Sequence, residues 1–181
     1  MSFTTIRVVG AHFDAAKAVA LVRRRNRRLF GLLPPTHECL LDDRPLYWPL
    51  DVAVATAWVK PPFRPEREAK LAVARDTITG KHGTVDVKLG DPSEVDVEPT
   101  AQVCEPLHTD DEEWWEFARN QLVIRYRPTW VNDLTLTERK RIYVPYRIVY
   151  CGASSWLVDL MLGRVVDTQT LDPRCQRSRE A

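Results

Sequence analysis

The sequence repeats itself at a fixed interval, and this repetition constrains the fold more than any other feature. Residues 46–54, LYWPLDVAV, correspond to residues 142–150, IYVPYRIVY, with Tyr and Pro at matching positions. Each copy leads to an aspartate followed four residues later by Gly and then by a basic residue, at 76–81 and at 159–164. Such self-similarity predicts two related structural units in one chain.

Alternating apolar residues predict a strand at the centre of each copy. The copies are offset by 96 residues, an even number, so both strands are expected to bury the same face. That face carries Leu46, Trp48, Leu50, Val52 and Val54 in the first copy and Ile142, Val144, Tyr146, Ile148 and Tyr150 in the second. Return strands are predicted at 71–75 and 155–158, which makes each copy an antiparallel hairpin.

Helical spacing of apolar residues predicts a helix from about residue 14 to 30, before the first hairpin. A second helix is predicted from about 110 to 123, with Thr109 as its N-cap. Its apolar side is expected to carry Trp115, Ala118 and Leu122. The 96-residue offset maps the first helix onto the second.

These elements predict an α+β protein of two pseudo-symmetric helix-plus-antiparallel-sheet repeats, packed as one compact body. The first repeat, with an extended hairpin, is placed in residues 1–100. The second, with a frayed tail, is placed in residues 101–181. With 44% hydrophobic residues, 181 residues can bury a core of useful size. The two Asp-to-Gly turns are read as structural, because the Asp side chain accepts backbone N–H groups and Gly closes the turn; their residues are Asp76, Gly80, Asp159 and Gly163.

The composition and the cysteine spacing limit the class of protein and its expected location. No apolar run reaches the length of about 18 residues that a membrane-spanning helix needs. The first residues lack the basic and apolar regions of a signal peptide. The four cysteines are widely spaced and form no Cys-x-x-Cys pair, so we expect free thiols and a cytoplasmic protein.

Charge is segregated along the chain although the net charge is only +1. Arginines crowd the first helix, whereas residues 89–118 carry carboxylates and no Lys or Arg. Both regions could be solvated faces, or each could neutralise the other. A third interpretation is a charged partner at the first helix, which would contact Arg23, Arg24, Arg27 and Arg28.

The first hairpin is longer than the second, because Asp76 follows Tyr47 by 29 positions and Asp159 follows Tyr143 by 16. The additional residues form a Pro-rich, charged segment, which is either a tolerated insertion or a contact loop. Candidate contact residues there are Trp58, Phe63 and Arg64. Trp114 is a further candidate anchor, because it and its neighbour Trp115 cannot share one helix face.

Catalytic and metal signatures are weak. His37, Cys39, Cys104 and His108 could form a zinc site only if two distant segments met, and their spacing is not that of a zinc finger. No phosphate-binding loop, nucleophile elbow or catalytic set is visible. We expect no cofactor, no metal and no catalytic residue, and lean against an enzyme.

The segments Ala74–Lys81 and Leu157–Arg164, each following a Tyr-rich strand, resemble the turn of PepSY-type modules and of cystatin-like modules more broadly. This resemblance implies a non-enzymatic module that binds or restrains another protein. We therefore predict a protein-binding or adaptor module, with an accessory subunit of a larger assembly as one form of it. The alternatives are nucleic-acid binding through the first helix and a small enzyme or ligand pocket in a cystatin-like half.

Overall fold

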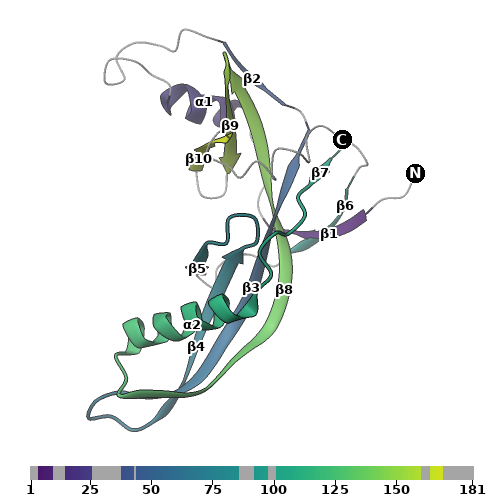
Figure 1. Ribbon diagram of the computed structural model, residues 1–181. Helices are drawn as coiled ribbons and strands as arrows, with labels where there is room; N and C mark the ends of the chain where they lie inside the picture. Colours follow the sequence, from purple (N-terminus) through teal and green to yellow (C-terminus); the bar gives the residue numbers. More distant parts are fainter. Residues whose placement is uncertain are drawn as a thin grey trace. The chain divides into compact units, whose positions relative to one another are not determined.

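The computed structural model describes residues 4–9, 15–25, 38–42, 44–85, 92–97, 101–159 and 164–168. Within these residues the chain is an α+β protein with two helices and ten strands (Figure 1). It divides into two units. Unit 1 comprises residues 1–48, 92–104 and 143–181, and unit 2 comprises residues 49–91 and 105–142. The predicted boundary near residue 100 therefore does not separate them, because each unit takes elements from both halves of the sequence.

Unit 2 is a helix on an antiparallel sheet. Its helix, α2 (Asp111–Tyr126), lies across strands in the order β8, β3, β4 and β5 (Figure 1). The strands are β3 (Leu46–Lys60), β4 (Arg67–Asp76), β5 (His82–Thr84) and β8 (Trp130–Cys151). β3 and β8 each continue into unit 1. The β3–β4 hairpin is paired without interruption from Leu50↔Asp76 to Val59↔Arg67.

Small side chains form the surface on which α2 packs. The core of unit 2 joins Ala53, Ala55, Ala57, Val59, Ala69, Leu71 and Val73 from the hairpin to Trp114, Ala118 and Leu122 from the helix. The prediction that Leu50, Val52 and Val54 form the buried face is therefore wrong beyond Pro49. The alanines let the helix approach the sheet closely, so the opposite alternation is buried against it.

The start of α2 also differs from the prediction. The N-cap is Asp110, whose side chain accepts the N–H of Glu112, in place of Thr109. Trp114 is buried, whereas Trp115 is partly exposed. The apolar stripe at i, i+4 and i+8 therefore begins one residue earlier than predicted.

Unit 1 packs α1 (Ala15–Arg25) on a sheet made by β2 (Cys39–Leu41), the second half of β8, β9 (Ser154–Asp159) and β10 (Arg164–Asp167). Ala18 and Val22 of the helix meet Val149 and Val158 of the sheet. Ile142, Val144 and Ile148 are buried as predicted, but Tyr150 is exposed.

Three short strands complete unit 1. β1 (Thr4–Val8) pairs antiparallel with β6 (Ser93–Val97) and parallel with β8. β7 (Gln102–Val103) pairs parallel with the start of β3. Parallel and antiparallel pairs therefore both occur. Neither α1 nor α2 is long and apolar enough to cross a membrane. The predicted end of the first helix beyond Arg25, Gly163 and the tail lie outside the described residues.

Candidate protein-interaction surface

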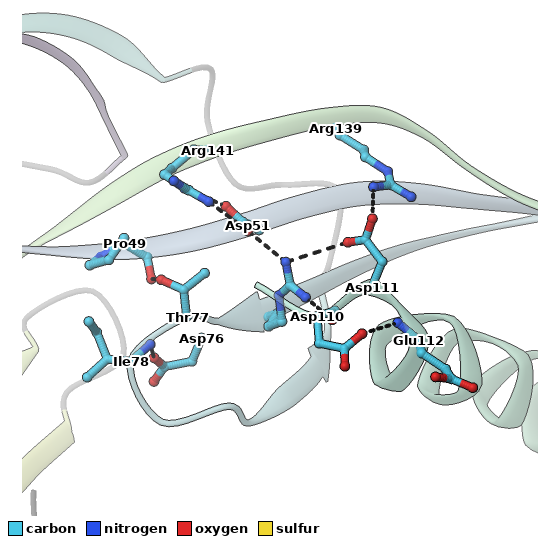
Figure 2. Close-up of polar contacts among 11 residues, drawn as sticks. Pro49, Asp51, Asp76, Thr77, Ile78, Asp110, Asp111, Glu112, Arg139 and Arg141 are labelled. Carbon is cyan, nitrogen blue, oxygen red and sulfur yellow. Dashed lines mark hydrogen bonds and ion pairs between the residues drawn. The ribbon is translucent and has the colours of Figure 1, made fainter. Parts of the chain in front are cut away.

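A buried aspartate holds the strands of unit 2 together (Figure 2). Asp51 on β3 is only 8% exposed. Its Oδ2 lies 2.9 Å from Nη2 of Arg75 on β4, and its two oxygens accept Nε and Nη2 of Arg141 on β8 at 2.7 and 3.1 Å. One carboxylate therefore links three strands.

The same network anchors the beginning of α2. Arg75 donates to the backbone carbonyl of Asp110 and lies 3.8 Å from the Asp111 carboxylate, which also pairs with Arg139 on β8 (Figure 2). Two guanidiniums stack on the ring of Trp114, that of Arg75 at 4.7 Å from the ring centroid and that of Arg139 at 5.8 Å. The helix is fixed on the sheet by both charge and stacking.

Electrostatics keep this network ionised. Burial by itself would raise the pKa of Asp51, but hydrogen bonds from Arg141 and Arg75 outweigh that effect and lower it below its usual value. Both oxygens of Asp51 already accept guanidinium N–H groups. A carboxylate held in this way is a structural anchor and a poor general base.

His82 lies beside this network. It is the strand partner of Arg75, and its ring stacks on Phe117 of α2 with 5.3 Å between centroids. Burial and the nearby Arg75 lower the pKa of His82, while Glu113 opposes them. The imidazole is therefore neutral near pH 7.

The first predicted turn is confirmed. Oδ1 of Asp76 accepts the N–H groups of Ile78 and Thr79, and the Gly80 N–H donates to the Asp76 carbonyl, with Gly80 at φ 70°. In the second turn Asp159 is buried and its carboxylate lies 3.5 Å from the Tyr146 hydroxyl. Both aspartates have structural contacts.

The tip of the long hairpin, residues 58–68, presents aromatic side chains to solvent. Phe63 is fully exposed and Trp58 is 46% exposed. Arg64 is exposed beside Phe63. Trp130, which was not predicted as a contact residue, is also partly exposed at the start of β8. Thr129, next to it, donates to the carbonyl of Lys60, two residues from Trp58.

Several contacts tie the hairpin tip to the connection between α2 and β8. The N–H and the hydroxyl of Thr129 both donate to the carbonyl of Lys60 at 2.7 Å. The guanidinium of Arg67 stacks on Tyr126 at 5.4 Å. Pro61 is buried. The tip is therefore a braced projection of unit 2.

The other predicted contact residues do not form part of the hairpin tip. The prediction that Trp114 is an exposed anchor is wrong, because its side chain is buried in the core and its ring stacks under the guanidinium of Arg75. Arg23 and Arg24 are exposed at the end of α1 in unit 1, whereas Arg25 stacks on Trp156. Arg27 and Arg28 lie outside the described residues.

The cysteines do not form the zinc set that the sequence allowed. Cys39 and Cys151 are strand partners in unit 1 and form a disulfide, so the expectation of free thiols is wrong for this pair. Cys104 is buried and is not part of this disulfide, and His37 lies outside the described residues. No group of three potential metal ligands occurs in the described part of the chain. The cytoplasmic location stays a prediction.

Sequence reasoning missed the Asp51 network, although a signal for it was present. Asp51 interrupts an apolar strand, and Arg75 ends the apolar run Leu-Ala-Val-Ala. A lone charge in such a strand requires a buried partner of opposite sign.

Comparison with models of known protein families, with curated proteins and with solved structures gives no significant match for this chain.

Replacing Asp51 tests its role as an anchor. Asp51→Asn removes the nearest counter-ion of the buried Arg75 and leaves only the more distant Asp111 carboxylate, and we expect it to lower the free energy of unfolding by about 3 kcal/mol at pH 7 in urea titrations. The contribution of Asp51 is present above its unfolded pKa of about 3.9 and is lost as pH falls through its lowered folded pKa. The difference between wild type and variant should therefore shrink below about pH 4. Asp133→Asn, at an exposed position, is the control; an equal loss in both variants would contradict the role.

Acid titration tests the half-buried imidazole of His82. Because the folded pKa of His82 is lowered, the unfolded chain binds its proton first, and wild type should lose stability as pH falls below about 6.5. His82→Phe keeps a ring against Phe117 and should reduce that loss, whereas Glu113→Gln should increase it. Urea midpoints measured from pH 7 to 5 decide the matter, and parallel curves for all three proteins would refute the assignment.

Proposed function

We propose that this protein is a non-catalytic binding module that contacts another protein through the tip of its long β3–β4 hairpin. One observation carries the proposal: Phe63 is fully exposed and has a backbone φ of 58°. A left-handed backbone costs a bulky L-residue roughly 1–2 kcal/mol. The exposed ring recovers none of that cost through burial within the chain.

The turn itself shows why this residue is unusual. Arg64 donates its N–H to the carbonyl of Pro61 at 3.4 Å, which closes a four-residue turn with Pro62 and Phe63 at its centre. Pro followed by a residue with positive φ is the pattern of a type II turn, in which the third position favours Gly or Asn. Phe at that position is poor for folding, and backbone strain of this kind concentrates at functional positions.

Bracing of the hairpin tip supports the proposal. Binding costs conformational entropy when loops and side chains must become ordered. The double hydrogen bond from Thr129 to Lys60 and the stacking of Arg67 on Tyr126 fix the tip before any partner arrives. Trp58 on β3 and Trp130 at the start of β8 are further exposed aromatic side chains of unit 2, and Trp and Arg are among the residues most enriched among interface anchors.

The repeat predicted from the sequence adds a second line of support, and we propose that the two units derive from it. Leu50 and Tyr146 are equivalent under the 96-residue offset, and each is the strand partner of the aspartate that begins its turn. Leu50 pairs with Asp76, and Tyr146 pairs with Asp159. Equivalent positions also face the helices. Ala53 packs in the α2 core, and Val149, 96 residues later, packs in the α1 core.

In this alignment the hairpin tip is the part of the first copy that the second lacks. The β8–β9 hairpin closes at Cys151↔Ser154, which corresponds to Ala55↔Leu71. Everything beyond that pair, including Trp58, Phe63 and Arg64, is additional to the shared scaffold. An extension that carries exposed aromatics is where a specific function is expected. The likeness to PepSY-type and cystatin-like modules remains part of this proposal.

A crystal structure tests the repeat. The helix α2 of unit 2 should superpose on α1 of unit 1, on the same face of the sheet. The strands of unit 2 should superpose on those of unit 1 and run in the same directions: residues 130–142 on β2, residues 49–60 on residues 143–151, β4 on β9, and β5 on β10. A helix on the opposite sheet face in one unit would contradict a common origin.

Two substitutions at one position test the proposed function. Phe63→Ala removes the ring and keeps the backbone strain, whereas Phe63→Gly removes both. Both should lower capture of the same partner from an extract of the source cells by tenfold or more, measured by quantitative mass spectrometry. Phe63→Gly should also raise the free energy of unfolding by about 1 kcal/mol relative to Phe63→Ala.

Leu40→Ala is the control for these captures, because Leu40 is a similarly exposed apolar residue in unit 1. Unchanged capture by both Phe63 variants would refute the proposed surface. Loss of bound nucleic acid on substitution of Arg23 and Arg24 would instead favour the alternative function at α1.

A further inference from the structure

We infer that the partner of the hairpin tip is a protein whose contact surface is acidic and holds an apolar pocket for Phe63. This inference rests on the proposed function and specifies the partner's chemistry. The surface concerned, called the tip surface below, comprises residues 58–70 together with residues 125–130. It carries six cations, Lys60, Arg64, Arg67, Lys70, Arg125 and Arg127, and two carboxylates, Glu66 and Glu68.

This excess of positive charge is local. The whole chain has a net charge of only +1, so the tip surface concentrates a charge that the rest of the molecule balances. Two of the six cations have contacts in the fold: Lys70 pairs with Glu68 at 3.3 Å, and Arg67 stacks on Tyr126. Within the described residues, Lys60, Arg64, Arg125 and Arg127 form no ion pair.

The two loops that present these cations are held together. Arg127 is the C-cap of α2 at φ 45°, with its N–H donating to the carbonyl of Val123. Two residues later, Thr129 donates twice to Lys60 at the end of β3. Arg127 and Arg64 therefore project from segments whose backbones are fixed by hydrogen bonds. Cations that are held in this way and form no ion pair within the described residues favour an oppositely charged partner.

The carboxylates favour a protein over a membrane or a nucleic acid. Glu66 follows Arg64 by two residues, and Glu68 is the strand partner of Trp58, so acidic groups lie among the aromatics. A phosphate-rich surface would repel both of them. A protein surface can offer carboxylates to the arginines, a basic group to Glu66 and an apolar pocket to Phe63.

Site-specific photocrosslinking tests this inference with the full-length chain. A benzophenone amino acid replaces Phe63, the protein is irradiated in an extract of the source cells, and the linked peptides are mapped by mass spectrometry. The expected result is one protein linked at a site surrounded by Asp and Glu. The yield should fall about tenfold when Arg64→Glu and Arg127→Glu are combined, and it should recover when the mapped carboxylates of the partner are changed to Lys.

A matched control and two other probes make the outcomes distinct. The control is Arg119→Glu, a reversal at an exposed position of α2 outside the tip surface, which should leave the yield unchanged. Vesicles with 30 mol% phosphatidylserine and a twenty-nucleotide oligo(dT) are tested for binding by the same charge-reversed protein and by wild type. Charge-dependent binding of either probe, or crosslinks to a neutral or basic protein surface, would overturn the inference.

The proposed function and this inference can fail separately. Crosslinks to a protein that persist at full yield after charge reversal would keep Phe63 as a binding residue and reject the acidic partner. No protein captured in a Phe63-dependent manner would reject both.

Discussion

The fold of unit 2 depends on one carboxylate placed between two guanidiniums. Asp51 lies on the central strand, and its partners Arg75 and Arg141 come from the strands on either side. Arg75 then reaches the first residues of α2 and stacks on Trp114. A buried charge is tolerated when it is paired with opposite charge, and moving any of these strands by one residue would break the pairs of Asp51, so this network favours one register of strands and helix. The braced hairpin extends from that fixed base.

Close packing explains the other distinctive property of the unit. A helix that lies on alanines leaves no room for larger side chains, and the stripe of Ala53, Ala55, Ala57 and Ala69 is continuous along the hairpin. The large residues Val52 and Val54 consequently take the other face, where they are only half-buried. The hairpin is thereby supported over most of its length by α2, while the residues past Lys60 project beyond the sheet.

The sequence predicted those features that depend on neighbouring residues. Both helices, both hairpins and the Asp76 turn follow from periodicity and from Asp and Gly at fixed positions. Hydrophobicity alone could not choose between the alanine face and the valine face of β3, because that choice is made by the helix. The pairing of Cys39 with Cys151 joins residues 112 positions apart and needs the tertiary fold. Phe63 is predicted from the sequence as a contact residue, but its backbone strain is visible only in three dimensions.

The division of each unit between both halves of the chain has a consequence for synthesis on the ribosome. Unit 2 is complete once residue 142 has emerged, whereas α1 in unit 1 packs against Val149 and Val158, which are made last. At about 5–20 residues per second, Ala18 and Val22 are made roughly 7–28 s before that surface is complete. During this interval only β2, at residues 39–41, is available to pack against the apolar side of α1. The helix of unit 1 is therefore translated long before most of the strands on which it packs.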